Sequence, residues 1–284
     1  MTNINYLLEA SKSLYDDITQ ELSDQSSKKY NHGEWTLAQL DNYRCQGLPK
    51  TLSKRYAENK QAWLTKEELV LIMDWKLAKG KFRPTLPKLI NSNTKEAVED
   101  ITKHGFQIWL DFTNGKHINK EYWTNTSNHK SYIDTVKKVF KKLCELRGVG
   151  PATASLILNL LRVNEALTAP FFSDESFLYY VIPNGEKIKY NLKEYTDELL
   201  PIYFKFLKLD STINMNTLER GGWALKMYDL YRITKLANIK LTFEVEECNI
   251  SQNNAFINIK SDKSNFRNES DDIKSPKRKQ RKLK

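Results

Sequence analysis

The stretch Leu146-Arg147-Gly148-Val149-Gly150-Pro151-Ala152-Thr153-Ala154-Ser155 predicts a tight turn between two helices. Before it, apolar residues recur at helical spacing opposite a lysine-rich face, at Tyr132, Val136, Val139, Phe140, Leu143 and Leu146. Pro151 suits the first position of a second helix, where a missing N–H costs no hydrogen bond, and an apolar run to Leu161 continues that helix. The two glycines permit a positive φ and a close backbone approach. We therefore expect a helical hairpin at residues 146–155.

The start of the second helix is a predicted phosphate-binding site. Its first N–H groups have no partner within the helix, and the helix dipole adds partial positive charge where they converge. The residues expected to surround the phosphate are Arg147, Gly148, Val149, Gly150, Pro151, Ala152 and Thr153. The alternative is an ordinary helical hairpin with a glycine turn and no ligand.

The pattern Leu-x-Gly-Val-Gly-Pro-x-Thr-Ala resembles the helix-hairpin-helix motif of the DNA glycosylase superfamily. The resemblance implies an all-α, two-lobed fold, a DNA backbone phosphate held by hairpin amides, and a catalytic aspartate downstream. Within that superfamily, the segments 75–84 and 171–175 are similar to the Amun-like proteins, a nuclear, glycosylase-related group. This narrower resemblance covers roughly residues 30–235.

Asp174, in Pro170-Phe171-Phe172-Ser173-Asp174-Glu175, matches the catalytic aspartate that the resemblance implies. A carboxylate there stabilises the positive charge that develops on the sugar as the base leaves, after the base has rotated out of the duplex. Asp174 follows Ala152 by 22 residues, a slightly longer connection than the family usually has. The alternative is that Asp174 is only the N-cap of a helix.

Some glycosylases of this superfamily use a lysine just inside the second hairpin helix as a nucleophile, and this chain has Ala152 there. Lys76, Lys79 and Lys81 offer other amines, but a solvated lysine stays protonated near neutral pH. The expected enzyme is therefore monofunctional: it leaves an intact abasic strand and forms no adduct that borohydride traps. A catalytically inactive nuclear DNA-binding or scaffold protein on the same fold is the main alternative, and a helical protein-interaction module is another. The sequence does not identify the substrate base, because it does not place the candidate pocket aromatics Trp109, Phe112, Trp123 and Phe171.

A second predicted DNA contact lies in Trp75-Lys76 and Lys79-Gly80-Lys81-Phe82-Arg83-Pro84. Cations mixed with aromatic residues at a helix end suit a nucleic-acid backbone and a stacked base, so Lys79, Lys81 and Arg83 are candidate DNA-binding residues. The alternative is a solvated helix end whose aromatic rings point inward.

The 284 residues, 40% of them hydrophobic, are enough to bury a substantial core. A net charge of +10 favours a polyanionic partner, but residues 260–284 carry ten Lys/Arg and four Asp/Glu, a net +6, which leaves +4 for residues 1–259. This moderate positive charge on residues 1–259 suits a protein that binds a few phosphates of double-stranded DNA locally. Three distant cysteines and four histidines without metal spacing predict no disulfide framework, zinc site or iron–sulfur cluster, so no metal or cofactor is expected.

Helices are expected at 5–22, 35–43, 93–112, 191–209 with a bend at Pro201, and 216–236, with a break at Gly47-Leu48-Pro49. Asn93, with Glu96 three residues later, is the expected N-cap of the helix at 93–112. Thr65 and Glu68 form a predicted capping box for a further helix that ends at Gly80. Alternation at Leu241, Phe243 and Val245 predicts one short strand. We expect one helical domain at 1–250 and a disordered tail at 251–284.

The tail ends in a basic run that predicts nuclear import, with a DNA tether or a solubilising tail as alternatives: Lys277, Arg278, Lys279, Arg281 and Lys282. The expected partners are therefore double-stranded DNA and the nuclear import machinery, and the expected location is the nucleus. No apolar stretch spans a bilayer and the first residues lack a signal-peptide pattern, so no membrane contact is expected.

Overall fold

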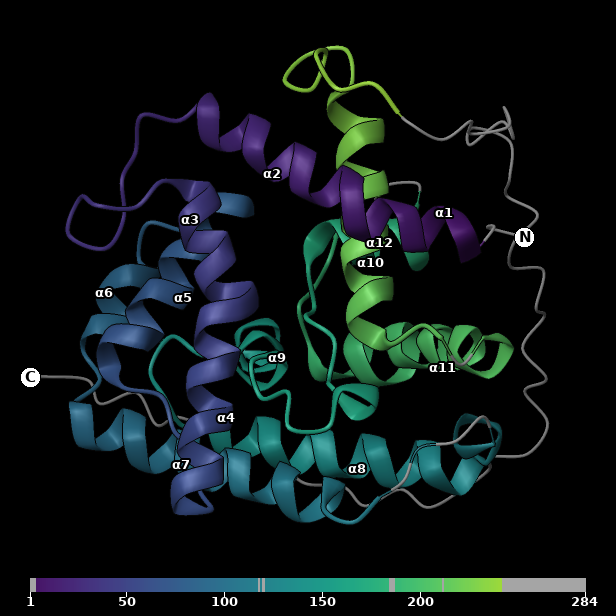
Figure 1. Cartoon of the computed structure of the whole chain (residues 1–284). Helices are drawn as coiled ribbons and strands as arrows, with labels where there is room; N and C mark the ends of the chain where they lie inside the picture. Colours follow the sequence, from purple (N-terminus) through teal and green to yellow (C-terminus); the bar gives the residue numbers. More distant parts are fainter. Residues whose placement is uncertain (1–3, 117, 119–120, 184–186, 211, 242–284) are drawn as a thin grey trace, which may run out of the picture. The chain divides into compact units, whose positions relative to one another are not determined.

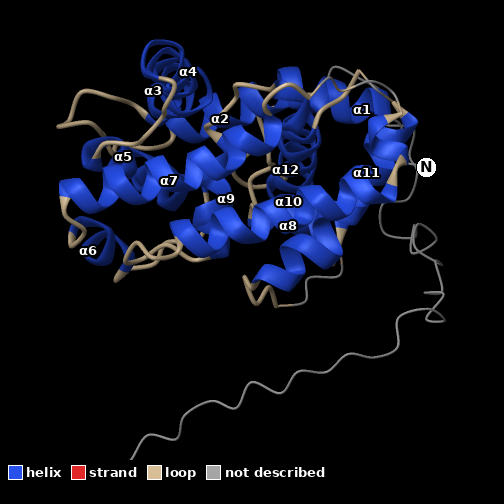
Figure 2. Ribbon diagram, turned by 90° about the horizontal axis from the view of Figure 1, so that it is seen from below, coloured by secondary structure: helices blue, strands red, loops and turns tan. Residues whose placement is uncertain are grey.

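The computed structural model describes residues 4–116, 118, 121–183, 187–210 and 212–241, all of which belong to one unit, Thr2–Glu244. The described residues form helices and loops without a β-strand, apart from one isolated antiparallel bridge between Tyr30 and Trp35 (Figure 2). The predicted all-α class is therefore confirmed. The strand expected at 241–245 lies, except for Leu241, outside the described residues, as does the tail at 251–284.

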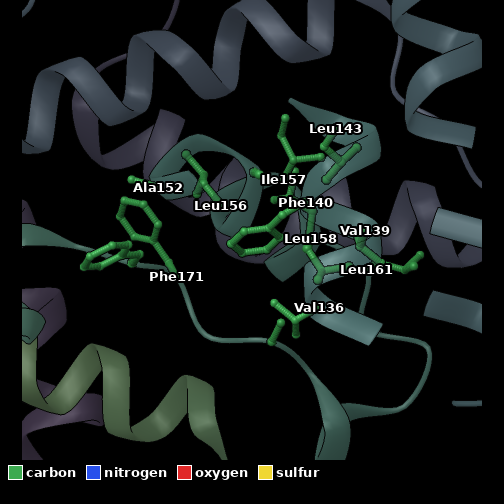
Figure 3. Close-up of a cluster of buried hydrophobic side chains, with 14 of the residues drawn as sticks. Val136, Val139, Phe140, Leu143, Ala152, Leu156, Ile157, Leu158, Leu161 and Phe171 are labelled. Atoms are coloured by element: carbon green, nitrogen blue, oxygen red, sulfur yellow. The ribbon is translucent and has the colours of Figure 1, made fainter. Parts of the chain in front are cut away.

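The two hairpin helices are α8 (Thr126–Leu143) and α9 (Pro151–Asn159). Every residue of α9 from Ala152 to Asn159 is buried, as expected of a helix that is apolar nearly all round. α9 accordingly lies in the middle of the other helices (Figure 1). The buried residues of α8, such as Val139 and Phe140, point toward Leu156 and Leu158 of α9 (Figure 3). The hairpin is thus anchored in the main hydrophobic core.

Helix α7 (Lys95–Thr113) packs along α8, and α6 (Leu86–Asn91) precedes it. The expected cap of α7, Asn93, is not the cap: the Thr94 hydroxyl accepts the Ala97 N–H instead. The Asn93 side chain bonds both the N–H and the carbonyl of Arg147, at 2.8 and 3.0 Å. A residue that resembles a cap in sequence therefore holds the hairpin in place.

The N-terminal and C-terminal helices of the described chain pack together. α1 (Ile4–Glu9), a π-helical segment Ala10–Leu14 and α2 (Tyr15–Asp24) form one continuous helical stretch that crosses α12 (Met215–Tyr231) (Figure 1). The crossing is close because α12 has a glycine there: a Cβ on Gly221 would lie 2.5 Å from the carbonyl oxygen of Leu7. Helices from both sides of the hairpin therefore share one fold.

The break expected at Gly47-Leu48-Pro49 is wrong. After α3 (Leu37–Asn42), the chain continues as a π-helical segment Tyr43–Gly47 and then as α4 (Leu48–Asn59). Pro49 lies in the first turn of α4, where its missing N–H costs little. The capping box of Thr65 and Glu68 is present and begins α5 (Lys66–Lys79).

The remaining helices follow the hairpin: α10 (Asp174–Tyr180), a π-helical segment Glu194–Leu199 and α11 (Leu200–Leu209). Pro201 lies in the first turn of α11, at the junction where a bend was expected. Short 3-10 turns occur at Tyr122–Thr124 and Glu165–Leu167. No helix in the described part of the chain combines the length and apolar character needed to cross a membrane.

Candidate active site

A cavity of about 260 Å³ opens where α5, the start of α9, the start of α10 and α12 meet. Trp75 and Lys76 line it from α5, Gly150 and Thr153 from the hairpin, and Asp174 from α10. Small-molecule sites usually measure roughly 300 to 1,000 Å³, so this cavity suits a small occupant. The predicted phosphate seat and the predicted catalytic carboxylate thus border one space, although they come from separate segments.

The hairpin leaves its helix N-terminus open. Gly150 is the N-cap of α9 and has no side chain to satisfy the first N–H groups; its carbonyl accepts only from Thr153 and Ala154. A Cβ on Gly150 would meet no atom within 4 Å, so the approach to these amides is free. Gly148 differs, because its φ is +84° and a Cβ there would lie 3.1 Å from Leu89 Cβ. The turn thus requires a glycine at position 148, whereas the glycine at position 150 leaves room for a ligand.

Asp174 is not the N-cap of α10. The cap is Ser173, whose hydroxyl accepts the Ser176 N–H and donates to Glu219 Oε1 at 2.8 Å. Asp174 occupies the first turn of the helix, where the dipole favours a negative charge. Its Oδ2 accepts a hydrogen bond from the Tyr190 hydroxyl at 2.6 Å. The alternative that Asp174 is only a helix cap is therefore wrong. The half-buried Asp174 carboxylate borders the cavity, and the Tyr190 hydroxyl fixes one of its two oxygens.

Two further carboxylates line the cavity. Burial, together with the neighbouring Asp174 charge, raises the pKa of Glu175 to about 7. Burial also raises the pKa of Glu219, on α12. Shifted carboxyl groups concentrated in one concave space are typical of functional sites. No sequence pattern singles out Glu219, which lies 45 residues after Asp174.

The two lysines at the end of α5 are not solvated, contrary to expectation. Lys79 is buried and forms an ion pair with Asp41 at 2.9 Å, so its ammonium is not on the surface for a DNA contact. Lys76 is half-buried and donates to Thr153 Oγ1 at 2.7 Å. Burial lowers the pKa of Lys76 to about 8, although the Asp174 charge opposes that shift.

The loop after α5 forms part of the rim of the cavity. Lys81 and Arg83 are exposed and border the cavity, and the Phe82 ring between them is 60% exposed. The Arg83 guanidinium stands 4.8 Å from the centre of the Tyr190 ring. The predicted cluster therefore divides: Lys81, Phe82 and Arg83 are on the surface, whereas Trp75 and Lys79 point into the protein.

The remaining predicted residues separate in the same way. Arg147 is exposed on the hairpin, Val149 and Ala152 are buried, and Pro151 lies between these extremes. Among aromatic residues that were candidates for a pocket, Phe171 borders the cavity, whereas Trp109 and Trp123 pack with Tyr132 in the core. Tyr190 was not identified from the sequence as a site residue. Its hydroxyl reaches Asp174 from a left-handed backbone conformation, with φ +57°, that no sequence pattern indicates.

The proposed import residues 277–282 lie outside the described residues. Within the described part, no three His, Cys, Asp or Glu side chains come close enough to form a metal site.

No family model, curated protein or solved structure matches this chain.

Proposed function

We propose that this protein is a DNA N-glycosylase of helix-hairpin-helix type, which rotates a base into the cavity and cleaves its N-glycosidic bond with the help of Asp174. The observation that supports this most directly is the common cavity of the Asp174 carboxylate and the open N-terminus of α9. A phosphate on one side and a carboxylate on the other are the two fixed points that a flipped nucleotide requires.

The hairpin would bind the backbone and leave the base sequence unread. The structure records hydrogen bonds for the N–H groups of Val149, Thr153 and Ala154, and none for those of Gly148, Gly150 and Ala152. Amides in this position, with the dipole of α9 behind them, favour a phosphate oxygen of any nucleotide. Exposed Arg147 adds a positive charge at the same turn.

The base would enter between apolar rings and a fixed negative charge. Trp75 and Phe171 border the cavity edge-to-face, with ring centres 5.7 Å apart. As the glycosidic bond breaks, positive charge develops on the sugar, and the Asp174 carboxylate stabilises it and orients the attacking water. The Tyr190 hydroxyl donates a hydrogen bond to that carboxylate and holds it in place.

The test uses purified protein and duplexes that carry assorted damaged bases, with abasic sites revealed by alkali. We expect base release from at least one substrate, and a loss of at least about a hundredfold in Asp174→Asn, with DNA affinity retained. Asp197→Asn is the matched control, because Asp197 is an exposed carboxylate on the Glu194–Leu199 segment outside the cavity. Base release by Asp174→Asn at the normal rate would overturn the assignment.

The main alternative is a nuclear DNA-binding or scaffold protein that has the same architecture without chemistry. It predicts duplex binding with no base release from any substrate. A protein that binds no duplex at low salt would instead favour a protein-interaction module. We further propose that the basic residues 277–282 direct import into the nucleus.

A further inference from the structure

Two parts of the cavity lining carry different groups. Lys81 and Arg83 form an exposed basic rim, whereas Glu175, Glu219 and Lys79 form what we call the inner end. Glu219 is 3% exposed and Lys79 is 8% exposed, and both act electrostatically on the Glu175 carboxyl, which places Glu175 beside them. The Lys79 ammonium already has an ion-pair partner, so the carboxyl groups determine what the inner end can bind.

The Glu175 carboxyl differs from the other two carboxyl groups of the cavity. Glu219 Oε1 accepts the Ser173 hydroxyl at 2.8 Å. Asp174 Oδ2 accepts the Tyr190 hydroxyl at 2.6 Å. For Glu175, the described side chains offer no hydrogen bond and no ion pair, and its carboxyl interacts with its own backbone N–H. Burial of a carboxyl without a paired side chain costs free energy, and such groups are typical of sites that meet a ligand.

The position of Glu175 on α10 separates it from the carboxylate that would act on the sugar. Asp174 and Glu175 are consecutive in the first turn of α10, and successive side chains of a helix point about 100° apart. The rings of Trp75 and Phe171 line the same cavity. A base that lies against these rings has its polar atoms at its edge, where a carboxylate oxygen accepts from an amine N–H and repels a carbonyl oxygen.

We propose that Glu175 selects the base by accepting a hydrogen bond from an exocyclic amine. The cavity then takes amino-bearing bases of the cytosine or adenine type in preference to their oxo counterparts, of the uracil or hypoxanthine type. This inference rests on the proposed function, because rotation of a nucleotide brings the base to Glu175. Asp174 acts on the sugar, and Glu175 is a specificity-determining residue that contacts the base.

The preference for an amine depends on the protonation of Glu175. Burial and the Asp174 charge raise the pKa of Glu175 to about 7, Glu219 on α12 acts in the same direction, and Lys79 on α5 opposes them. Above this pKa the carboxylate only accepts hydrogen bonds. Below it the protonated carboxyl also donates, so it serves a carbonyl oxygen as well as an amine. Discrimination between the two classes of base therefore increases as the pH rises through about 7.

The experiment measures binding, so that it does not depend on base cleavage. Two duplexes differ in one nucleotide, cytosine or uracil, placed opposite an abasic site, where neither base loses a pairing partner. A fluorine at C2′ of that nucleotide disfavours positive charge on the sugar and keeps the base attached. With the full-length protein we expect cytosine to bind more tightly than uracil by at least about tenfold at about pH 8, and this ratio to fall toward one at about pH 6. An adenine and hypoxanthine pair repeats the comparison for purines.

Glu175→Gln is the diagnostic variant. Its amide both donates and accepts, does not titrate in this range, and removes a buried charge without a paired side chain, so we expect a folded protein with a ratio near one at both pH values. Glu198→Gln is the matched control, because Glu198 is exposed on the Glu194–Leu199 segment outside the cavity, and it should keep the wild-type ratios.

Equal affinity of the wild-type protein for the amino and oxo duplexes at about pH 8 would overturn the proposal, as would an unchanged preference in Glu175→Gln. Release of damaged bases is measured separately. Base release without amino-versus-oxo discrimination refutes the role of Glu175 alone. Discrimination that Glu175→Gln removes, without base release from any substrate, refutes the glycosylase and leaves the base-binding site in place.

Discussion

The Tyr190 hydroxyl donates to Asp174 Oδ2 at 2.6 Å, and this bond links the segment before the Glu194–Leu199 helix to the first turn of α10. Tyr190 has a left-handed backbone, with φ +57°, which costs a non-glycine residue roughly 1 to 2 kcal/mol. The Arg83 guanidinium, 4.8 Å from the centre of the Tyr190 ring, connects the same residue to the exposed loop after α5. The candidate carboxylate is therefore positioned by a residue whose strained geometry the surrounding fold maintains.

Tyr190→Phe tests that positioning. Removal of a hydrogen bond to a charged group costs roughly 1.5 to 3 kcal/mol, so we expect base release to slow by about tenfold or more. The effect should appear in kcat, with DNA affinity unchanged, because Tyr190 holds the carboxylate and the hairpin holds the phosphate. Tyr231→Phe, outside the cavity, is the control. Equal rates for Tyr190→Phe and the wild type would show that the bond has no catalytic role.

Substitutions at the two hairpin glycines should separate binding from stability. Gly150→Arg fills the phosphate seat and should abolish duplex binding, whereas Gly150→Ala should be tolerated because its Cβ meets no atom within 4 Å. Gly148→Ala should instead destabilise the fold by about 1 to 2 kcal/mol, because alanine is strained at a positive φ. Anisotropy titrations and thermal unfolding measure the two effects. Normal affinity of a folded Gly150→Arg variant would remove the hairpin from the interface.

Phe82 is the exposed aromatic residue at the rim, flanked by Lys81 and Arg83. An aromatic side chain there can insert into the stack and occupy the gap that a rotated base leaves. We expect Phe82→Ala to weaken binding to a duplex with an abasic site by roughly 1 to 3 kcal/mol. Leu209→Ala is the control, since Leu209 is 68% exposed at the end of α11. Equal losses from the two variants would assign Phe82 no specific contact.

Glu175 should make the folded protein less stable as the pH rises, because its pKa is higher in the folded state than in the unfolded chain. The folded protein retains the Glu175 proton up to about pH 7, whereas the unfolded chain releases it near 4.5. The folded state therefore binds more protons between these values, and the free energy of unfolding falls as the pH rises through them. Glu175→Gln should remove this loss, which is on the order of 3 kcal/mol. Parallel curves for the two proteins in urea titrations from about pH 4.5 to pH 7 would contradict the assignment.

Deletion of residues 275–284 tests the proposed location. The segment is strongly basic, so its loss should reduce nuclear accumulation of a fluorescent fusion and leave thermal unfolding of the helical body unchanged. A substitution of Lys260 by glutamine, outside the basic run, is the control. An undiminished nuclear signal after the deletion would show that import uses another route.

The sequence by itself determined the class of fold and the central hairpin. Apolar residues at helical spacing require one buried face, and Pro151 and the capping box of Thr65 mark helix starts through local geometry alone. Local rules failed where distant segments decide the outcome. Asn93 carries the signature of a cap but bonds Arg147. The helix continues through Gly47, where Arg44, Cys45 and Leu48 on either side of the glycine are buried in the core. Such outcomes depend on packing partners that no local pattern contains.

The candidate site shows the same division. The sequence singled out Asp174 and the hairpin, which are contiguous motifs, but not Tyr190, Glu219 or the different environments of Lys76 and Lys79. These two lysines are three positions apart on one helix, and only the tertiary structure gives one a carboxylate and the other a hydroxyl. A pKa depends on burial and on charges a few ångströms away, and both are set by segments that meet only in the folded chain.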